Sequence, residues 1–154
     1  GYRKPLFLAG PQSTSAHLGR KETFLKRWQD AFGATPDVVS VARYDPQLAY
    51  DQVVGYFADH PALNNVDIIV CENDALAVGA VDAIRTKLGL RVPEDIAVIG
   101  FDDIPQADSA NYKLTTYRQP LSAMAEGLVE VLKGTSENEH LRHFLGKLVV
   151  RESA

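Results

Sequence analysis

The sequence is poor in the residues that mark several common protein classes. It holds one cysteine, Cys71, among 154 residues, which excludes an internal disulfide and a zinc site built from several cysteines. Its apolar runs are of strand length, far short of the roughly 20 residues that cross a bilayer. The formal net charge is −4, whereas a DNA-binding domain usually carries a basic face. This segment alone is therefore not expected to span a membrane or to bind DNA.

The motifs of common enzyme families are missing as well. The chain has no glycine-rich loop for dinucleotides or phosphates and no G-x-S-x-G sequence around a nucleophilic serine. His140 and His143 lie three residues apart, but in a polar stretch without carboxylates nearby, so we interpret them as exposed residues rather than metal ligands. The neighbouring Asp102 and Asp103, with the distant Lys147, leave open a phosphotransfer domain or a small hydrolase. Our main expectation is a protein without catalytic activity, metal or cofactor.

Apolar residues make up 45% of the chain and alternate between strand-like and helix-like patterns. Strands are predicted at Pro5–Gly10, Val38–Ala42, Val66–Cys71, Ile96–Gly100, Leu114–Tyr117 and Phe144–Arg151. Helices are predicted at Arg20–Phe32, Pro46–Ala58, Ala75–Leu88 and Leu121–Lys133. Strands that alternate with helices are typical of an α/β fold, in which a parallel sheet is sandwiched between helices.

Polar and aromatic side chains follow each of the first four predicted strands. They are Arg20 after the first, Tyr44 and Asp45 after the second, Asn73 and Asp74 after the third, and Phe101 and Asp102 after the fourth. Ligands of open parallel sheets bind beyond the carboxyl ends of the strands, so we expect these side chains to share one edge. Carboxylate, amide and guanidinium groups pair well with neighbouring hydroxyl groups. The edge therefore suits a sugar or another polyol.

Several of these residues also have an ordinary structural interpretation. Asp45 and Asp74 stand where helix N-caps stand, and Asn73 could close a turn through its own side chain. Arg20 could be a solvated charge, and the two aromatic residues could be packing residues. Asp102 favours a ligand role more strongly, because it directly follows a buried strand and Asp103 can already serve the turn.

Four sequence blocks carry a resemblance to a known family. They are NDALAVGA from Asn73, GLRVPEDIAVIGFDD from Gly89, LTTYRQP from Leu114 and LVVRES from Leu148. Their order and spacing resemble the LacI/GalR family of bacterial transcription regulators. The resemblance implies a periplasmic-binding-protein-like sensor of two α/β lobes that clamp an effector between them. Residues 1–119 resemble the C-terminal lobe, and residues 120–154 a crossover helix, normally packed on the first lobe, with a closing strand.

The resemblance also implies roles for particular residues. The effector-contacting positions carry over to Arg20, Asn73, Asp102 and Gln119, and Tyr44 or Asp45 falls near an aromatic effector position. The implied effector is a small molecule, a sugar or other polyol more than a nucleobase.

The implied assembly is a cytoplasmic homodimer. Its contact is expected on the Ala75–Leu88 helix and the Ile104–Tyr112 loop. DNA would be bound only through an N-terminal helix-turn-helix outside this chain. The main rival is a periplasmic sugar-binding receptor of a transport system, and the Leu114–Pro120 and Val92–Asp95 blocks favour the regulator.

Overall fold

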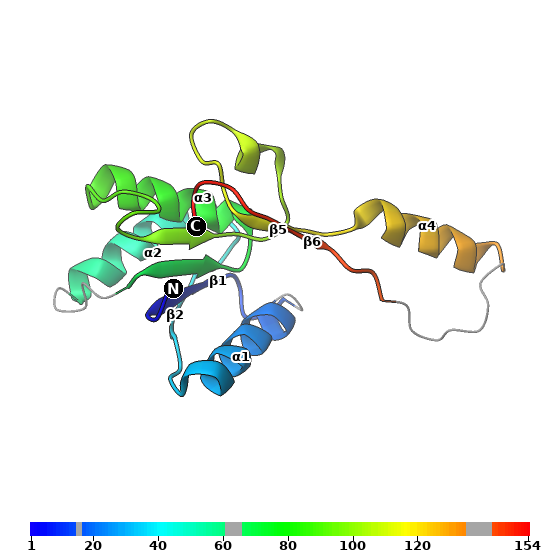
Figure 1. Cartoon of the computed structure of the whole chain (residues 1–154), viewed down its shortest axis with the longest axis horizontal. Helices are drawn as coiled ribbons and strands as arrows, with labels where there is room; N and C mark the ends of the chain where they lie inside the picture. The colour runs from blue at the N-terminus through cyan, green and yellow to red at the C-terminus, as the bar shows by residue number, and fades with distance from the viewer. Residues whose placement is uncertain (15–16, 61–65, 135–142) are drawn as a thin grey trace.

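Four parallel strands form the sheet at the centre of the chain (Figure 1). They are β1 (Pro5–Ala9), β2 (Asp37–Ser40), β3 (Ile68–Cys71) and β4 (Ala97–Ile99), in the order β2-β1-β3-β4. The structure is a computed structural model that describes residues 1–14, 17–60, 66–134 and 143–154. All three strand pairings are parallel. The carboxyl ends of the four strands therefore meet at one edge of the sheet.

Helices cover both faces of this sheet. Helix α1 (Glu22–Phe32) lies on one face, and α2 (Pro46–Asp59) and α3 (Asp74–Asp82) lie on the other (Figure 1). Alternating side chains of β1 divide between the two: Phe7 meets Phe24 of α1 with 5.3 Å between ring centroids, whereas Leu6 and Leu8 join the larger core under α2 and α3. The predicted fold class, a parallel sheet sandwiched between helices, is confirmed.

Helices α2 and α3 begin at polar side chains that cap them. Asp45 accepts a hydrogen bond from the Leu48 backbone N–H at 3.0 Å, and Asn73 accepts one from Leu76 N–H at 3.0 Å. The sequence analysis put Asp74 at the capping position, and this was wrong by one residue. Asp74 is instead the first residue of α3 and is fully buried, because its carboxylate binds groups from two other segments.

Some element ends differ from the predicted ones. The expected Ala75–Leu88 helix is divided into α3 and a π-helical turn, η2 (Ala83–Lys87), which ends before Gly89 at a positive φ of 68°. A second π-helical turn, η1 (His17–Lys21), precedes α1, and a 3-10 turn, η3 (Pro105–Asp108), follows β4. These turns keep the helical path while changing the hydrogen-bond spacing, which a count of apolar residues does not detect.

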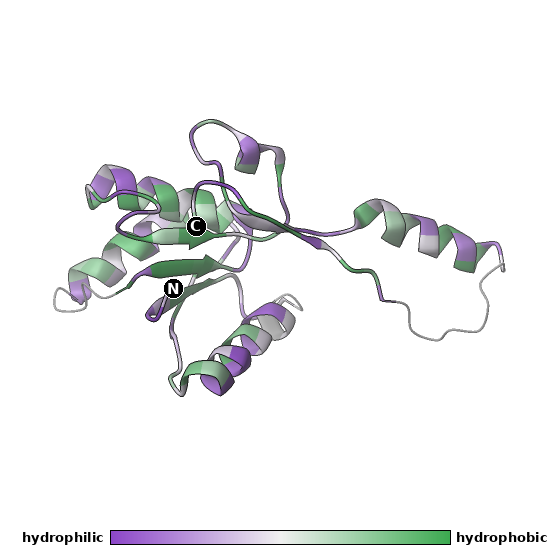
Figure 2. Ribbon diagram, viewed as in Figure 1, coloured by the Kyte–Doolittle hydropathy of each residue, from purple (hydrophilic) through white to green (hydrophobic). Residues whose placement is uncertain are grey.

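The last segments extend away from the sheet. Strands β5 (Thr116–Arg118) and β6 (Lys147–Val149) pair antiparallel, and α4 (Leu121–Leu132) stands beyond them, apart from the other helices (Figure 1). Large apolar side chains of α4 are exposed, with Leu128 at 66% and Leu132 at 86% (Figure 2). The chain then returns to the sheet, where Ser153 O accepts from Val98 N–H at 2.8 Å.

Two expectations concern features outside the sheet. His143 is exposed, as predicted, whereas its proposed neighbour His140 lies outside the described residues. Within the ranges that the structure describes, no group of three or more metal-binding side chains occurs. In the same ranges, every helix is too short or too polar to cross a membrane.

Candidate functional site

Arg20 connects two strand ends at the carboxyl edge of the sheet. One guanidinium nitrogen donates to the Glu72 carbonyl oxygen at 2.9 Å, at the end of β3. The other forms an ion pair with Asp102 Oδ1 at 3.3 Å, after β4. Both side chains keep partial access to solvent, 26% for Arg20 and 30% for Asp102. Arg20, which the sequence left between a ligand contact and a solvated charge, is thus held at the edge with two hydrogen-bond partners.

Gln119 extends this chain of contacts to the strand that leaves the sheet. Its side-chain amide donates to Asp102 Oδ1 at 2.7 Å. The same oxygen, Asp102 Oδ1, therefore accepts hydrogen bonds from the Arg20 guanidinium and from the Gln119 amide. Arg20, Asp102 and Gln119, three of the predicted effector residues, form one continuous cluster.

Phe101 forms an aromatic surface under the cluster. The Arg20 guanidinium lies over its ring, with 3.7 Å from Cζ to the ring centroid. Phe101 also stacks on Tyr117 of β5, with 5.0 Å between centroids. A cation over an aromatic face is attracted to the ring's negative charge density. The ring thus restrains the arginine while leaving its donor atoms in the plane available.

Tyr44 stands beside this cluster at the ends of β1 and β3. Its hydroxyl lies 3.0 Å from the Thr14 hydroxyl. Burial raises the pKa of Tyr44, the Thr14 hydrogen bond lowers it, and the neighbouring Glu72 raises it again. Glu72 is buried, with only 1% of its surface exposed, and accepts a hydrogen bond from the Gly10 N–H. This corner therefore presents an aromatic ring and a hydroxyl beside a buried carboxylate.

Asp45 and Asn73 have their side chains engaged in helix capping. The ordinary interpretation of Asp45 as a cap is confirmed by its bond to Leu48 N–H. Asn73 lies next to Glu72, whose carbonyl binds Arg20, so it remains at the same edge of the sheet. The structure therefore brings Arg20, Phe101, Asp102 and Gln119 into direct contact and places Asn73 and Asp45 along the same edge as caps.

The loop after β4 has an unusual backbone. Asp102 has φ of 114° and Asp103 has φ of 57°, both in the left-handed region that residues other than glycine seldom occupy. Asp74 supports the loop from below: its carboxylate accepts from Ile104 N–H at 2.9 Å and from the Thr116 hydroxyl at 2.6 Å. Backbone strain of this kind persists only where surrounding contacts enforce it, and it concentrates at functional sites.

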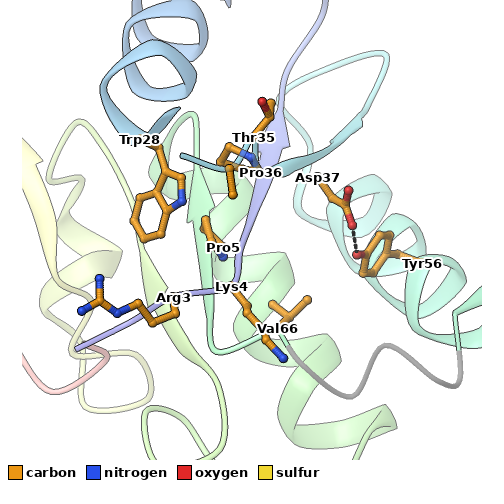
Figure 3. A pocket seen from close by; sticks show the side chains of 10 residues that line it. Arg3, Lys4, Pro5, Trp28, Thr35, Pro36, Asp37, Tyr56 and Val66 are labelled. Atoms are coloured by element: carbon orange, nitrogen blue, oxygen red, sulfur yellow. Dashed lines mark hydrogen bonds between the residues drawn. The ribbon is translucent and has the colours of Figure 1, made fainter. Parts of the chain in front are cut away.

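Two hollows adjoin the cluster. One of about 730 Å³ lies between α1 and strands β3 and β4, and is lined mainly by apolar residues with Arg20 and Glu72 at its end. The other, of about 520 Å³, lies beyond the sheet where Asp102, Gln119 and Leu121 meet. A third hollow of about 250 Å³ lies at the opposite, amino end of the strands, between Trp28 and Tyr56 (Figure 3). Polar effector candidates line the first two hollows, so the candidate site lies at the carboxyl edge.

The sequence analysis did not single out several residues that organise this edge. They are Glu72, Tyr117, Asp74 as a buried anchor, and the ion pairs of Asp103 with Arg118 and Arg151. The sequence signal that could have indicated these residues is their position next to predicted site residues. Glu72 precedes Asn73, Asp103 follows Asp102, and Arg118 precedes Gln119. The buried partners of these residues were not predictable from that spacing.

Comparisons with known proteins agree with this geometry. The model of the periplasmic binding protein-like domain family matches residues 1–154. The transcriptional regulator MalR of Streptomyces coelicolor is 34% identical over 149 residues, which cover 94% of this chain and 43% of the relative. The chain thus spans less than half of that curated relative.

Solved structures give the same result. A LacI-family regulatory protein from Corynebacterium glutamicum has a TM-score of 0.83 at 27% identity, covering 99% of this chain and 59% of that one. A LacI-family regulator from Arthrobacter sp. FB24, in complex with lactose, has a TM-score of 0.80 at 28% identity, covering 99% of this chain and 58% of that one. The class defined by fold and edge is thus a periplasmic-binding-protein-like domain. Within that class the chain belongs to the LacI/GalR family of transcription regulators, as an effector-binding domain and not as an enzyme.

Proposed function

We propose that this chain binds a sugar or a similar polyol through Arg20, Asp102 and Gln119, with Asn73, Tyr44, Asp45 and Phe101 around them. The observation that supports this most is the continuous chain of contacts from Arg20 through Asp102 to Gln119. A guanidinium donates hydrogen bonds, a carboxylate accepts them, and an amide does both. Together these groups can bind a sugar hydroxyl, which is both a donor and an acceptor. Phe101 adds an aromatic face for the apolar side of a sugar ring.

Two further observations support the binding of a small molecule that exchanges with water, and the second of them supports a sugar. The cluster keeps partial solvent access, so a guest can exchange with water without breaking the fold. The Arthrobacter sp. FB24 relative has lactose as its ligand. Each charged hydrogen bond to a hydroxyl contributes about 1.5–3 kcal/mol. A handful of such bonds suffices for selective binding of one sugar.

The effector is proposed to act between two lobes. Residues 1–119 form one lobe, and residues 120–154 contain a helix that covers the other lobe and a strand that returns. The exposed apolar side chains of α4 support this assignment, because an uncovered apolar helix face is unfavourable in water. A sugar held by both lobes favours one angle between them and so shifts the equilibrium of DNA binding, with a coupling of about 1–3 kcal/mol. DNA contact, in the cytoplasm, belongs to a segment outside this chain.

The same proposal includes a homodimer. The side chains from Leu76 in α3 to Ile84 in η2 are almost all buried inside the chain. A dimer contact on this side would therefore use the last turn, with the exposed Arg85, Thr86 and Lys87, and the Ile104–Tyr112 loop. Tyr112 ties this loop to the helix by donating to Asp82 at 3.1 Å, so the two parts form one surface.

The experiment is calorimetry on the complete gene product with lactose, cellobiose, sucrose and maltose, with adenine as a nucleobase comparison. Binding of one disaccharide, weakened at least about tenfold by Asp102→Asn, is expected because a charged hydrogen bond exceeds 1.4 kcal/mol. Asp108→Asn is the matched control, since Asp108 is 67% exposed and binds Lys113 and Arg151 instead. Binding of adenine alone, or equal loss in both variants, would contradict the proposal.

A further inference from the structure

Asp103 lies between the two strands that connect the sheet to α4. Its carboxylate accepts a hydrogen bond from Arg118 Nε, on the outgoing strand β5. It accepts another, at 2.8 Å, from a guanidinium nitrogen of Arg151, which follows the returning strand β6. Only 3% of the Asp103 side chain is exposed, against 12% for Arg151 and 58% for Arg118. One buried carboxylate therefore joins both connecting segments.

The two arginines are themselves attached to the lobe. Arg151 donates to the Leu114 carbonyl at 2.7 Å, and its backbone N–H donates to the Thr115 hydroxyl at 2.9 Å. Arg118 is the last residue of β5 and lies directly before Gln119. Burial alone would raise the pKa of Asp103, but the hydrogen bonds from Arg151 and Arg118 outweigh it and lower that pKa. The carboxylate is thus held in its charged form between fixed cations.

Asp103 and Arg118 each adjoin a residue of the effector cluster in the sequence. Asp103 follows Asp102, and Arg118 precedes Gln119, while Gln119 donates to Asp102 at 2.7 Å. The Asp102 backbone N–H also donates to the Tyr117 carbonyl at 3.0 Å. Two short segments, residues 102–103 and 117–119, are therefore joined by three interactions: one backbone hydrogen bond, one ion pair and one side-chain hydrogen bond.

The backbone at this point needs such support. Asp102 and Asp103 are consecutive residues at positive φ, a backbone conformation that is unfavourable for residues other than glycine. The ion pairs hold Asp103 in this conformation from the side, in addition to the contacts of the loop with Asp74 and Tyr117. A shift of Asp103 would move the adjacent Asp102 carboxylate relative to Gln119.

We propose that Asp103 is a positioning residue of the effector site, which holds Asp102 against Gln119 by binding Arg118 and Arg151. The inference rests on the proposed function, because Asp102 and Gln119 are there assigned to the sugar. Asp103 itself contacts no ligand in this scheme. Its role is to keep Asp102 and Gln119, the two residues proposed to bind sugar hydroxyl groups, at a fixed separation although they lie on different segments.

The first arm of the test is spectroscopic and needs no ligand. Asp103→Asn keeps the side-chain shape and the tolerance for left-handed backbone but removes the charge. We expect the side-chain amide resonances of Gln119, measured by NMR on the full chain, to move toward those of a solvated glutamine. Asp108→Asn, which removes a carboxylate from the same Arg151, is expected to leave them in place. Unchanged Gln119 resonances in Asp103→Asn would overturn the inference.

The second arm measures affinity in the complete gene product, for whichever of the four disaccharides binds best. Asp103→Asn is expected to weaken binding about tenfold, and Arg118→Met by a smaller factor, because Arg151 still binds Asp103 in that variant. The double variant is expected to bind no more weakly than Asp103→Asn, because the Arg118 interaction is already lost there. Arg118→Lys restores a cation and is expected to recover most of the affinity. Additive losses from the two single variants, or no recovery with lysine, would contradict the role of Asp103.

The two arms separate the inference from the proposed function. If no disaccharide binds the unaltered protein, the sugar proposal fails and the Gln119 resonances still decide the role of Asp103. If a disaccharide binds and Asp103→Asn binds it equally well, the inference alone fails. If Asp103→Asn does not fold, Arg118→Met, which alters a 58% exposed side chain, decides both arms.

Discussion

The guanidinium of Arg20 lies 3.7 Å above the ring of Phe101 while one of its nitrogens bonds Asp102. These two restraints come from consecutive residues after β4, and the Glu72 carbonyl after β3 adds a third. Two strand ends therefore fix the position of a side chain that arises from the segment before α1. An arginine held on both an aromatic face and a carboxylate loses little further conformational freedom when a ligand binds.

Loss of the Arg20 cation should therefore reduce sugar affinity more than loss of a nearby exposed cation. We expect Arg20→Met to weaken binding at least about tenfold, since it removes a charged donor worth roughly 1.5–3 kcal/mol. Arg27→Met is the matched control, because Arg27 is exposed on α1 two turns further along and borders the same hollow. Calorimetry with the best-binding disaccharide measures both. Similar losses in the two variants would contradict the assigned role.

Asp74 and Asp103 should contribute to stability with opposite pH dependence. Burial raises the pKa of Asp74 above its ordinary 3.8 despite hydrogen bonds from Thr116 and Ile104. A carboxyl group with a higher pKa in the folded chain binds its proton more tightly there, so its contribution falls as pH rises from about 3.8 through the raised value. The pKa of Asp103 is lowered, so its contribution is present above about 3.8 and is lost as pH falls through the lowered value.

Urea unfolding over a pH series checks this difference. Relative to Asp74→Asn, the unaltered chain is expected to gain stability as pH falls toward 4. Relative to Asp103→Asn, it is expected to lose stability as the solution becomes more acidic. Parallel curves for the unaltered chain and both variants would show that neither carboxyl group titrates differently on folding.

The core under α3 should be sensitive to truncation, and α4 should not. Leu76 is fully buried among side chains of α2 and the sheet, so Leu76→Ala is expected to lower the free energy of unfolding by about 2–5 kcal/mol. Leu132→Ala removes the same atoms from a side chain that is 86% exposed, and is expected to have almost no effect on unfolding. Denaturant titration of the 154-residue chain compares them. A large loss at Leu132 would indicate that α4 is covered in solution.

Two helical glycines offer a matched pair with opposite expected signs. A Cβ at Gly79 would meet Ala49 Cβ at 2.9 Å and the Pro46 backbone, because α2 and α3 approach closely there. Gly79→Ala should therefore destabilise the fold. Gly55→Ala in α2 points into open space and should stabilise it by about 0.5–1 kcal/mol through helix propensity. Thermal melts of both variants measure the difference, and stabilisation by both would exclude the close helix contact.

The fold class was predictable because the periodicities are strong. Apolar β-branched segments of strand length alternate with helical repeats, and that alternation permits few architectures other than a layered parallel sheet. The cap at Asp45 was predictable for the same local reason, since Pro46 at the first helical position fixes where α2 begins. The other helix start was less determined, because Asn73 and Asp74 can both cap.

Tertiary contacts decided between those two residues. Asp74 turns inward because Thr116, 42 residues later in the sequence, supplies a buried hydroxyl for its carboxylate. The ion pairs of Asp103 likewise depend on Arg151, 48 residues away. Local pattern carries no information on such pairings, so the prediction of edge residues included Asp102 and Gln119 but not what holds them together.

The sequence by itself determined which residue types follow each strand, and hence that arginine, carboxylate, amide and aromatic groups meet at one edge. This follows because the carboxyl ends of parallel strands coincide and side-chain order is fixed by the chain. Only the tertiary structure decided that the carboxylates of Asp74 and Asp103 turn inward to hold that edge in place. That choice depends on buried partners from distant segments, whose hydrogen bonds outweigh the cost of removing one carboxylate from water.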